Sequence, residues 1–120
     1  MRFSPAAIAL SLSFAMISSA SISGRADDDI DPQSTALLKS GQDAMKAGKT
    51  EDAIGWYETA LAVDPRNRAA YIAMAEAVQK QGLNGKAIRF YKEALEIDPN
   101  DQIALGGQAE AMIAKGAIEP

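Results

Sequence analysis

The chain has 120 residues, enough for one small domain, and it contains neither cysteine nor histidine. The absence of these two residue types excludes disulfides, thiolate chemistry, zinc sites and imidazole general bases. The formal net charge of −4 argues against binding to a phosphate backbone, which requires a basic face.

Residues 1–26 have the pattern of a secretory signal peptide. A positive start at Arg2 precedes an uncharged apolar stretch over residues 5–17, and small residues follow it. This order is typical of a cleaved leader. Cleavage is expected after Ala26, with Ala20 as the alternative site. The protein would then be periplasmic or secreted from a bacterium.

An uncleaved membrane anchor is the alternative interpretation of the same segment. Residues 3–22 carry no charge, and such a run is formally long enough to span a bilayer. The run contains six serines, however, and each hydroxyl weakens insertion. We therefore favour cleavage and expect no membrane contact afterwards, while an N-terminally anchored protein stays the alternative.

Residues 27–33 form a short acidic segment, which we expect to be a disordered leader of the mature chain. Aspartates at alternate positions from Asp27 to Asp31 resemble the start of a calcium-binding loop. Pro32 stands where such a loop requires glycine, and Leu38 stands where its bidentate glutamate belongs. We expect a solvated leader and no metal site.

Two consecutive segments of the chain, residues 34–67 and residues 68–101, repeat one another. When they are aligned without a gap, ten positions are identical, whereas chance at average composition gives roughly two or three. The identical pairs are Ala36/Ala70, Lys46/Lys80, Gly48/Gly82, Ala53/Ala87, Ile54/Ile88, Tyr57/Tyr91, Ala60/Ala94, Leu61/Leu95, Asp64/Asp98 and Pro65/Pro99. A fixed period of about 34 residues is typical of stacked helical hairpins, which form a surface rather than a catalytic pocket.

Turn and cap residues recur with the same period. Gly48 and Gly82 are expected to end the first helix of each hairpin, because glycine adopts the left-handed C-terminal conformation without a Cβ penalty. Pro65 and Pro99 are expected to follow the second helices, because proline disfavours a helical predecessor. The predicted N-caps are Thr50, Asn67, Asn84 and Asp101.

These segments resemble the tetratricopeptide repeat family, whose pattern combines W-x₂-L-G-x₂-Y with A-x₃-F, A and P in each repeat. The second half of each segment matches well, whereas the first half is looser, with Leu37 in place of the aromatic and Ser40 in place of leucine. The structural core positions that the resemblance implies are Gly41, Ala53, Tyr57, Ala60, Pro65, Ala75, Ala87, Tyr91, Ala94 and Pro99.

The resemblance implies an all-α fold of antiparallel helix-turn-helix repeats, stacked as a short right-handed α-solenoid of about five helices behind the signal peptide. The expected segments are a first repeat over 34–67, a second over 68–101, a half-repeat capping helix over 102–116 and a tail over 117–120. Gly106 and Gly107 lie inside that last helix, where each costs roughly 1 kcal/mol relative to alanine.

In the family, the first helix of each hairpin lines a concave groove that contacts peptides or helices. The partner-binding residues implied for this chain are Thr35, Leu38, Gln42, Met45, Ala69, Ile72, Glu76, Gln79, Ile103, Glu110 and Ile113. They would form an apolar floor, at Leu38, Ile72 and Ile103, beside a mildly acidic strip, which suits a short apolar or basic-apolar peptide. The Lys/Asn/Arg clamp by which one subclass binds acidic chaperone tails is absent, because the corresponding positions are uncharged here.

We therefore predict a protein–protein interaction module without catalytic residues, cofactor, metal or nucleic-acid partner. By family analogy it would be a periplasmic adaptor or assembly factor that binds an envelope or secretion component. The alternative is a self-associating structural protein. Two and a half repeats lie just below the three usually needed for stability, so a weak homodimer through the C-terminal helix would complete the stack.

Overall fold

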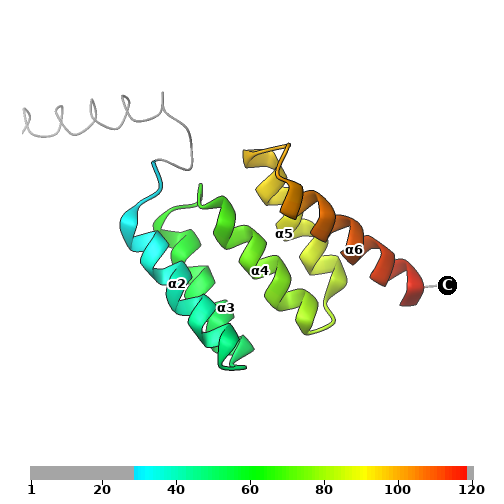
Figure 1. Ribbon diagram of the computed structural model, residues 1–120, viewed down its shortest axis with the longest axis horizontal. Coiled ribbons are helices and arrows are strands. Elements are labelled where there is room, and N and C mark those ends of the chain that lie inside the picture. The colour runs from blue at the N-terminus through cyan, green and yellow to red at the C-terminus, as the bar shows by residue number, and fades with distance from the viewer. Residues whose placement is uncertain (1–28, 119–120) are drawn as a thin grey trace, which may run out of the picture.

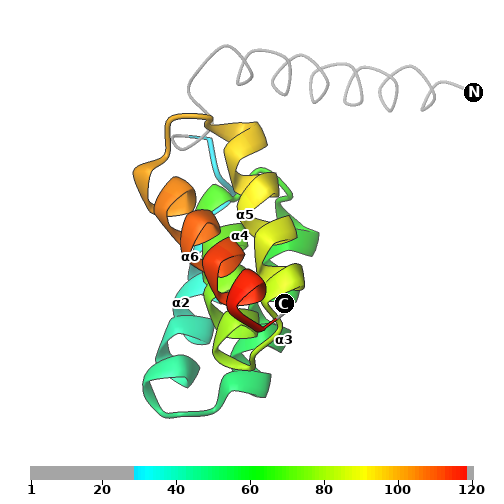
Figure 2. The same cartoon turned by 90° about the vertical axis from the view of Figure 1, so that its right-hand side faces the viewer.

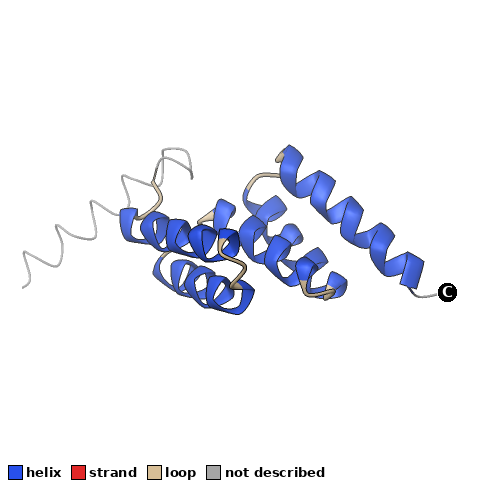
Figure 3. Cartoon of the chain, turned by 60° about the horizontal axis from the view of Figure 1, so that its bottom comes forward, coloured by secondary structure: helices blue, strands red, loops and turns tan. Residues whose placement is uncertain are grey.

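The computed structural model describes residues 29–118, which form five α-helices (Figure 1). The predicted signal peptide lies outside the described residues. The helices are α2 (Pro32–Lys46), α3 (Thr50–Val63), α4 (Arg68–Lys80), α5 (Asn84–Ile97) and α6 (Gln102–Ile118). Figure 3 shows them joined by short loops.

The helices form two layers, with α2, α4 and α6 in one and α3 and α5 in the other (Figure 2). Helices α2 and α3 pack as one hairpin and α4 and α5 as the next, while α4 contacts each of the other four helices. The first helices of successive hairpins therefore lie side by side. The prediction of an all-α stack of helix-turn-helix units is confirmed.

Two glycines close the turns inside the hairpins. Gly48 and Gly82 have φ angles of +79° and +83°, a region in which residues with a Cβ are strained. After Gly48, the N–H of Lys49 donates to the carbonyl of Ala44 over 2.9 Å, which closes a Schellman turn. The prediction that both glycines end helices is confirmed.

The N-cap predictions divide into two correct and two wrong. Asn67 caps α4 and Asp101 caps α6, each accepting a hydrogen bond from a backbone N–H three residues ahead, over 3.2 and 2.9 Å. Thr50 and Asn84 are not caps, because each is the first residue of its helix and the preceding Lys49 and Leu83 make no side-chain cap bond. The tight Schellman turn consumes only one residue after the glycine, so the next helix begins one residue earlier than expected.

Helix α2 begins at Pro32, inside the segment 27–33 that was expected to be disordered. Asp31 caps it, because its carboxylate accepts a 2.7 Å bond from the N–H of Gln33. The backbone N–H of Asp31 donates to Oδ2 of Asp64 over 2.9 Å. Proline suits the first position of a helix, where no partner for an N–H is available. The end of the predicted leader is thus part of the fold.

A polar contact joins the hairpins at the same place in each repeat. Ser34 donates its hydroxyl to the carbonyl of Ala60 over 2.7 Å, and Asn67 donates to the Ser34 hydroxyl over 2.9 Å. One period later, an ion pair between Arg68 and Asp101 replaces this hydroxyl–amide pair. Both arrangements satisfy polar groups that the packing removes from water.

Both layers of helices supply the core, and α4 alone contributes seven buried residues. Eight of the ten predicted core positions are buried, namely Gly41, Ala53, Tyr57, Ala60, Ala75, Ala87, Tyr91 and Ala94. Pro65 and Pro99 are exposed, contrary to the expectation. They lie in the turns after α3 and α5, where the ring ends the helix without inserting between helices.

Candidate functional site

Among residues 29–118, three hollows lie along the layer formed by α2, α4 and α6. The largest of these three, about 440 Å³, lies between α4 and α6, where Tyr91 of α5 forms part of its wall. A second of about 390 Å³ lies between α2 and α4, and a third of about 230 Å³ joins the two. Glu76 lines all three. They are therefore parts of one surface, which we call the concave groove.

Most of the residues predicted for partner binding meet in the concave groove. The eight that line it are Gln42, Met45, Ala69, Ile72, Glu76, Gln79, Ile103 and Glu110. Thr35 and Ile113 are exposed but line none of the hollows. Eight of the eleven residues predicted for partner binding therefore lie together in the concave groove, and their role in binding stays a prediction.

Leu38 does not form the floor of the groove. Its side chain is 8% exposed and belongs to the core cluster that contains Tyr57 and Met74. Leu38 follows the buried Ser34 by four residues and precedes the buried Gly41 by three, so all three share the face of α2 that packs inward. Ile72 is also buried, although it still lines the smallest hollow.

The groove contains residues that the first-helix pattern could not reveal. Tyr57 and Tyr91 come from the second helices, yet each lines a hollow between two first helices. The Tyr91 hydroxyl donates to Oε1 of Gln79 over 3.2 Å. The signal in the sequence was the tyrosine itself, because the same aromatic residue occupies the same place in each repeat. Lys46 and Lys80 also line the groove, at the ends of α2 and α4.

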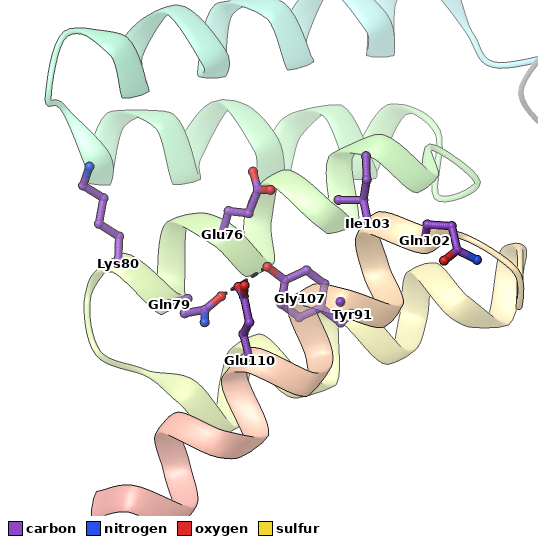
Figure 4. A pocket seen from close by; sticks show the side chains of 9 residues that line it. Glu76, Gln79, Lys80, Tyr91, Gln102, Ile103, Gly107 and Glu110 are labelled. Atoms are coloured by element: carbon purple, nitrogen blue, oxygen red, sulfur yellow. Dashed lines mark hydrogen bonds between the residues drawn. The ribbon is translucent and has the colours of Figure 1, made fainter.

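Carboxylates dominate the centre of the groove. In Figure 4, Gln79 and Glu110 converge on the Tyr91 hydroxyl with Glu76 nearby, whereas Lys80 extends away from them. Burial raises the pKa of Glu76, because the groove walls remove part of its water. Lys46 and Lys80 lie in the last turns of their helices, where the helix dipole favours a cation. The basic groups thus lie at one edge and leave the centre acidic.

The pKa values of Tyr57 and Tyr91 reflect both their burial and the negative charge of the groove. Burial raises the pKa of Tyr91 to about 12, with further contributions from the negative charges of Glu76 and Glu110. Burial also raises the pKa of Tyr57, and Glu76 is the second cause there. A tyrosine whose pKa is raised by folding keeps its proton longer in the folded state, so stability falls as pH rises above the unfolded value of about 10.

We expect substitutions of the two groove glutamates to separate these effects. Glu76→Gln is expected to lower the pKa of both Tyr57 and Tyr91, whereas Glu110→Gln is expected to lower only that of Tyr91. Carbon NMR of the three tyrosines as a function of pH measures this, with Tyr71 as the internal control. Equal shifts of Tyr57 and Tyr91 in Glu110→Gln would contradict the arrangement.

Comparison with known proteins identifies the repeat. The family model described as tetratricopeptide repeat matches residues 38–102, which is more than half of the chain. No curated protein matches the chain.

Two solved structures share the fold. The first TPR of Spaghetti (RPAP3), bound to the HSP90 peptide SRMEEVD, aligns with a TM-score of 0.69 and 22% identity over 72% of this chain and 71% of that chain. The second TPR of the same protein, bound to the same peptide, aligns with a TM-score of 0.69 and 24% identity over 72% of this chain and 80% of that chain. At this level of identity the likeness concerns the fold.

Proposed function

The chain belongs to the tetratricopeptide repeat family, and from that premise we propose that it is a protein–protein interaction module whose concave groove binds a short extended peptide. The observation that carries the proposal is the continuity of the groove across three successive first helices, with Glu76 shared by all its hollows. A peptide lying across α2, α4 and α6 would place one side chain in each hollow. No catalytic group is needed for this role.

The chemistry of the groove favours an apolar peptide that carries a lysine or arginine. Met45 and Ile103 supply apolar contacts, and Glu76 and Glu110 supply the negative charge. Glu76 is partly desolvated, so a peptide cation beside it would offset the cost that raises its pKa. The peptide SRMEEVD, which the related Spaghetti domains hold, carries acidic side chains. We expect it to bind poorly to a groove with carboxylates at its centre.

The test uses two short probe peptides that differ only in one central residue, lysine in one and glutamate in the other. Isothermal titration calorimetry is expected to detect binding of the lysine probe and at least about tenfold weaker binding of the glutamate probe. Glu76→Gln is expected to weaken the binding of the lysine probe about tenfold. Removing the charge takes away the partner of the peptide cation but leaves the volume of the side chain nearly unchanged.

Glu93→Gln provides the matched control, because Glu93 is exposed on α5 and does not line the groove. It is expected to leave the affinity for the lysine probe unchanged. Equal affinities for the two probes would contradict the acidic centre as the recognition element. A loss of affinity in Glu93→Gln as large as in Glu76→Gln would place the binding site elsewhere.

For the biological setting, we propose a periplasmic adaptor or assembly factor whose client is an envelope or secretion component. The signal-peptide pattern over residues 1–26 supports this proposal. Within residues 29–118, no helix combines the length and the apolar character needed to cross a bilayer. N-terminal sequencing of the protein from a bacterial envelope fraction tests the assignment. A chain that starts at Asp27 or at Ser21 supports cleavage and export, whereas a chain that starts at Met1 contradicts cleavage.

A further inference from the structure

Helix α6 presents an uncovered apolar face. Leu105 and Met112 are 42% and 51% exposed, and Ala109 and Gly116 on the same side are exposed as well. We call these four residues the α6 pairing face. They recur at intervals of four, three and four positions, so they form one stripe along the helix.

The equivalent stripe in the preceding repeat is covered. One repeat period earlier, Tyr71, Ala75 and Val78 of α4 occupy the places of Leu105, Ala109 and Met112. They pack in the core cluster that α5 completes, and Ala75 and Val78 are buried. Within residues 29–118, α6 has no second helix to cover its stripe. The stripe therefore has the composition of a packing surface.

The order of residues on the α6 pairing face makes it complementary to itself. Large and small residues alternate along the stripe, from Leu105 through Ala109 and Met112 to Gly116. If two copies of α6 lie antiparallel about a two-fold axis between Ala109 and Met112, then Leu105 faces Gly116 of the second copy. Ala109 likewise faces Met112 of the second copy. A two-fold interface requires that such contacts be reciprocal, and here each large side chain meets a small one.

The distribution of charge also favours a second copy of the chain as the partner of this face. The α6 pairing face carries no charged residue, and the nearest charges lie to its sides. Glu110 lines the concave groove, and the Cε atom of Lys115 lies 3.7 Å from the position a Cβ would take at Gly85 in α5. Two copies that pair through this face therefore bury no ionised group, which would be costly.

We propose that the protein forms a two-fold dimer in which the α6 pairing faces of two copies pack antiparallel. The face lies on a different side of α6 from Ile103 and Glu110, so both concave grooves stay open in the dimer. One helix pair buries less than the roughly 1,200–2,000 Å² of a standard interface. The dimer is therefore weak, with an expected Kd between about 10 µM and 1 mM.

Sedimentation equilibrium of the purified full chain, across concentrations up to about 1 mM, measures the dimer. Ala109→Met is expected to weaken it at least about tenfold, because the introduced methionine would then oppose Met112 of the second copy. The double variant Ala109→Met/Met112→Ala exchanges large and small while preserving the match. It is expected to restore the Kd to within about threefold of the parent value.

Ile103→Ala is the matched control, because it removes an exposed apolar side chain from the groove side of the same helix. It is expected to leave the Kd of the dimer unchanged and to weaken binding of the lysine probe peptide. The two results together distinguish dimerisation from peptide binding in the groove. Circular dichroism verifies that every variant keeps its helix content. A parent protein that stays monomeric at about 1 mM overturns the proposal.

Two further outcomes also overturn it. If Ala109→Met dimerises as tightly as the parent or more tightly, association follows total apolar area rather than the match of sizes. If the double variant stays as weak as Ala109→Met alone, the antiparallel register is wrong.

Discussion

Replacing Gly41 with alanine is expected to lower the free energy of unfolding by about 1–3 kcal/mol, although alanine is the better helix former. A Cβ at Gly41 would lie 2.3 Å from Cε1 and 2.6 Å from Cδ1 of Tyr57. The ring cannot retreat easily, because Tyr57 is 2% exposed and packed between α2 and α4. The hairpin must open to accept the new methyl group.

Gly55→Ala is the matched control for this substitution. Gly55 lies inside α3, and nothing lies within 4 Å of a Cβ added there. The free energy of unfolding is therefore expected to rise by about 0.5–1 kcal/mol. Urea unfolding followed by the fluorescence of Trp56, the single tryptophan, measures both variants. Equal stability of Gly41→Ala and the parent would contradict the close contact with Tyr57.

Removing the Asp64 side chain is the second substitution that is expected to lower the free energy of unfolding strongly. Asp64 is 4% exposed, and its carboxylate accepts hydrogen bonds from the N–H of Asp31 over 2.9 Å and from the N–H of Arg66 over 3.0 Å. The Arg66 guanidinium also donates to it over 3.2 Å. Asp64→Ala leaves these donors without their acceptor and is expected to cost about 1–3 kcal/mol.

The same contacts give a pH dependence. Burial by itself would raise the pKa of Asp64, but the hydrogen bonds from Asp31 and Arg66, with the charge of Arg66, outweigh it and lower the pKa. Because the folded pKa is depressed, this stabilisation is complete above the unfolded value of about 3.9. It is lost as pH falls through the lower folded pKa.

Thermal unfolding between about pH 2 and pH 6 measures this loss. Asp64→Asn is expected to reduce the fall of Tm as the pH decreases, which we call the acid branch of the Tm curve. Asp98→Asn, the equivalent change one repeat later, is expected to alter it less, because the Asp98 side chain is 43% exposed. Identical acid branches for the two variants would contradict the assignment to Asp64.

The second helices could be predicted from sequence because their constraints are local and steric. Tyr57, Ala60 and their equivalents are apolar residues at the same places in both repeats, where each must fit between two helices, and all four are buried. Gly48 and Gly82 were predictable for a similar reason, since a positive φ is nearly restricted to glycine.

The first helices were harder to interpret, because the period shows which positions are equivalent but not which are covered. Leu38 and Ile72 are equivalent and apolar, and both were expected on the groove floor, yet Leu38 belongs entirely to the core. Gly107 shows the same limit. Helix propensity alone predicts that alanine would stabilise the site, but a Cβ there would lie 2.4 Å from Cζ of Tyr91. Only the three-dimensional packing reveals that contact.

The measurement that tests the central claim most directly is backbone amide NMR of the protein titrated with the lysine probe peptide. The account predicts that the largest shift changes lie on the groove sides of α2, α4 and α6, with their centre at Glu76. The exposed sides of α3 and α5 should change little. Shift changes confined to α3 and α5, or to the α6 pairing face, would contradict it.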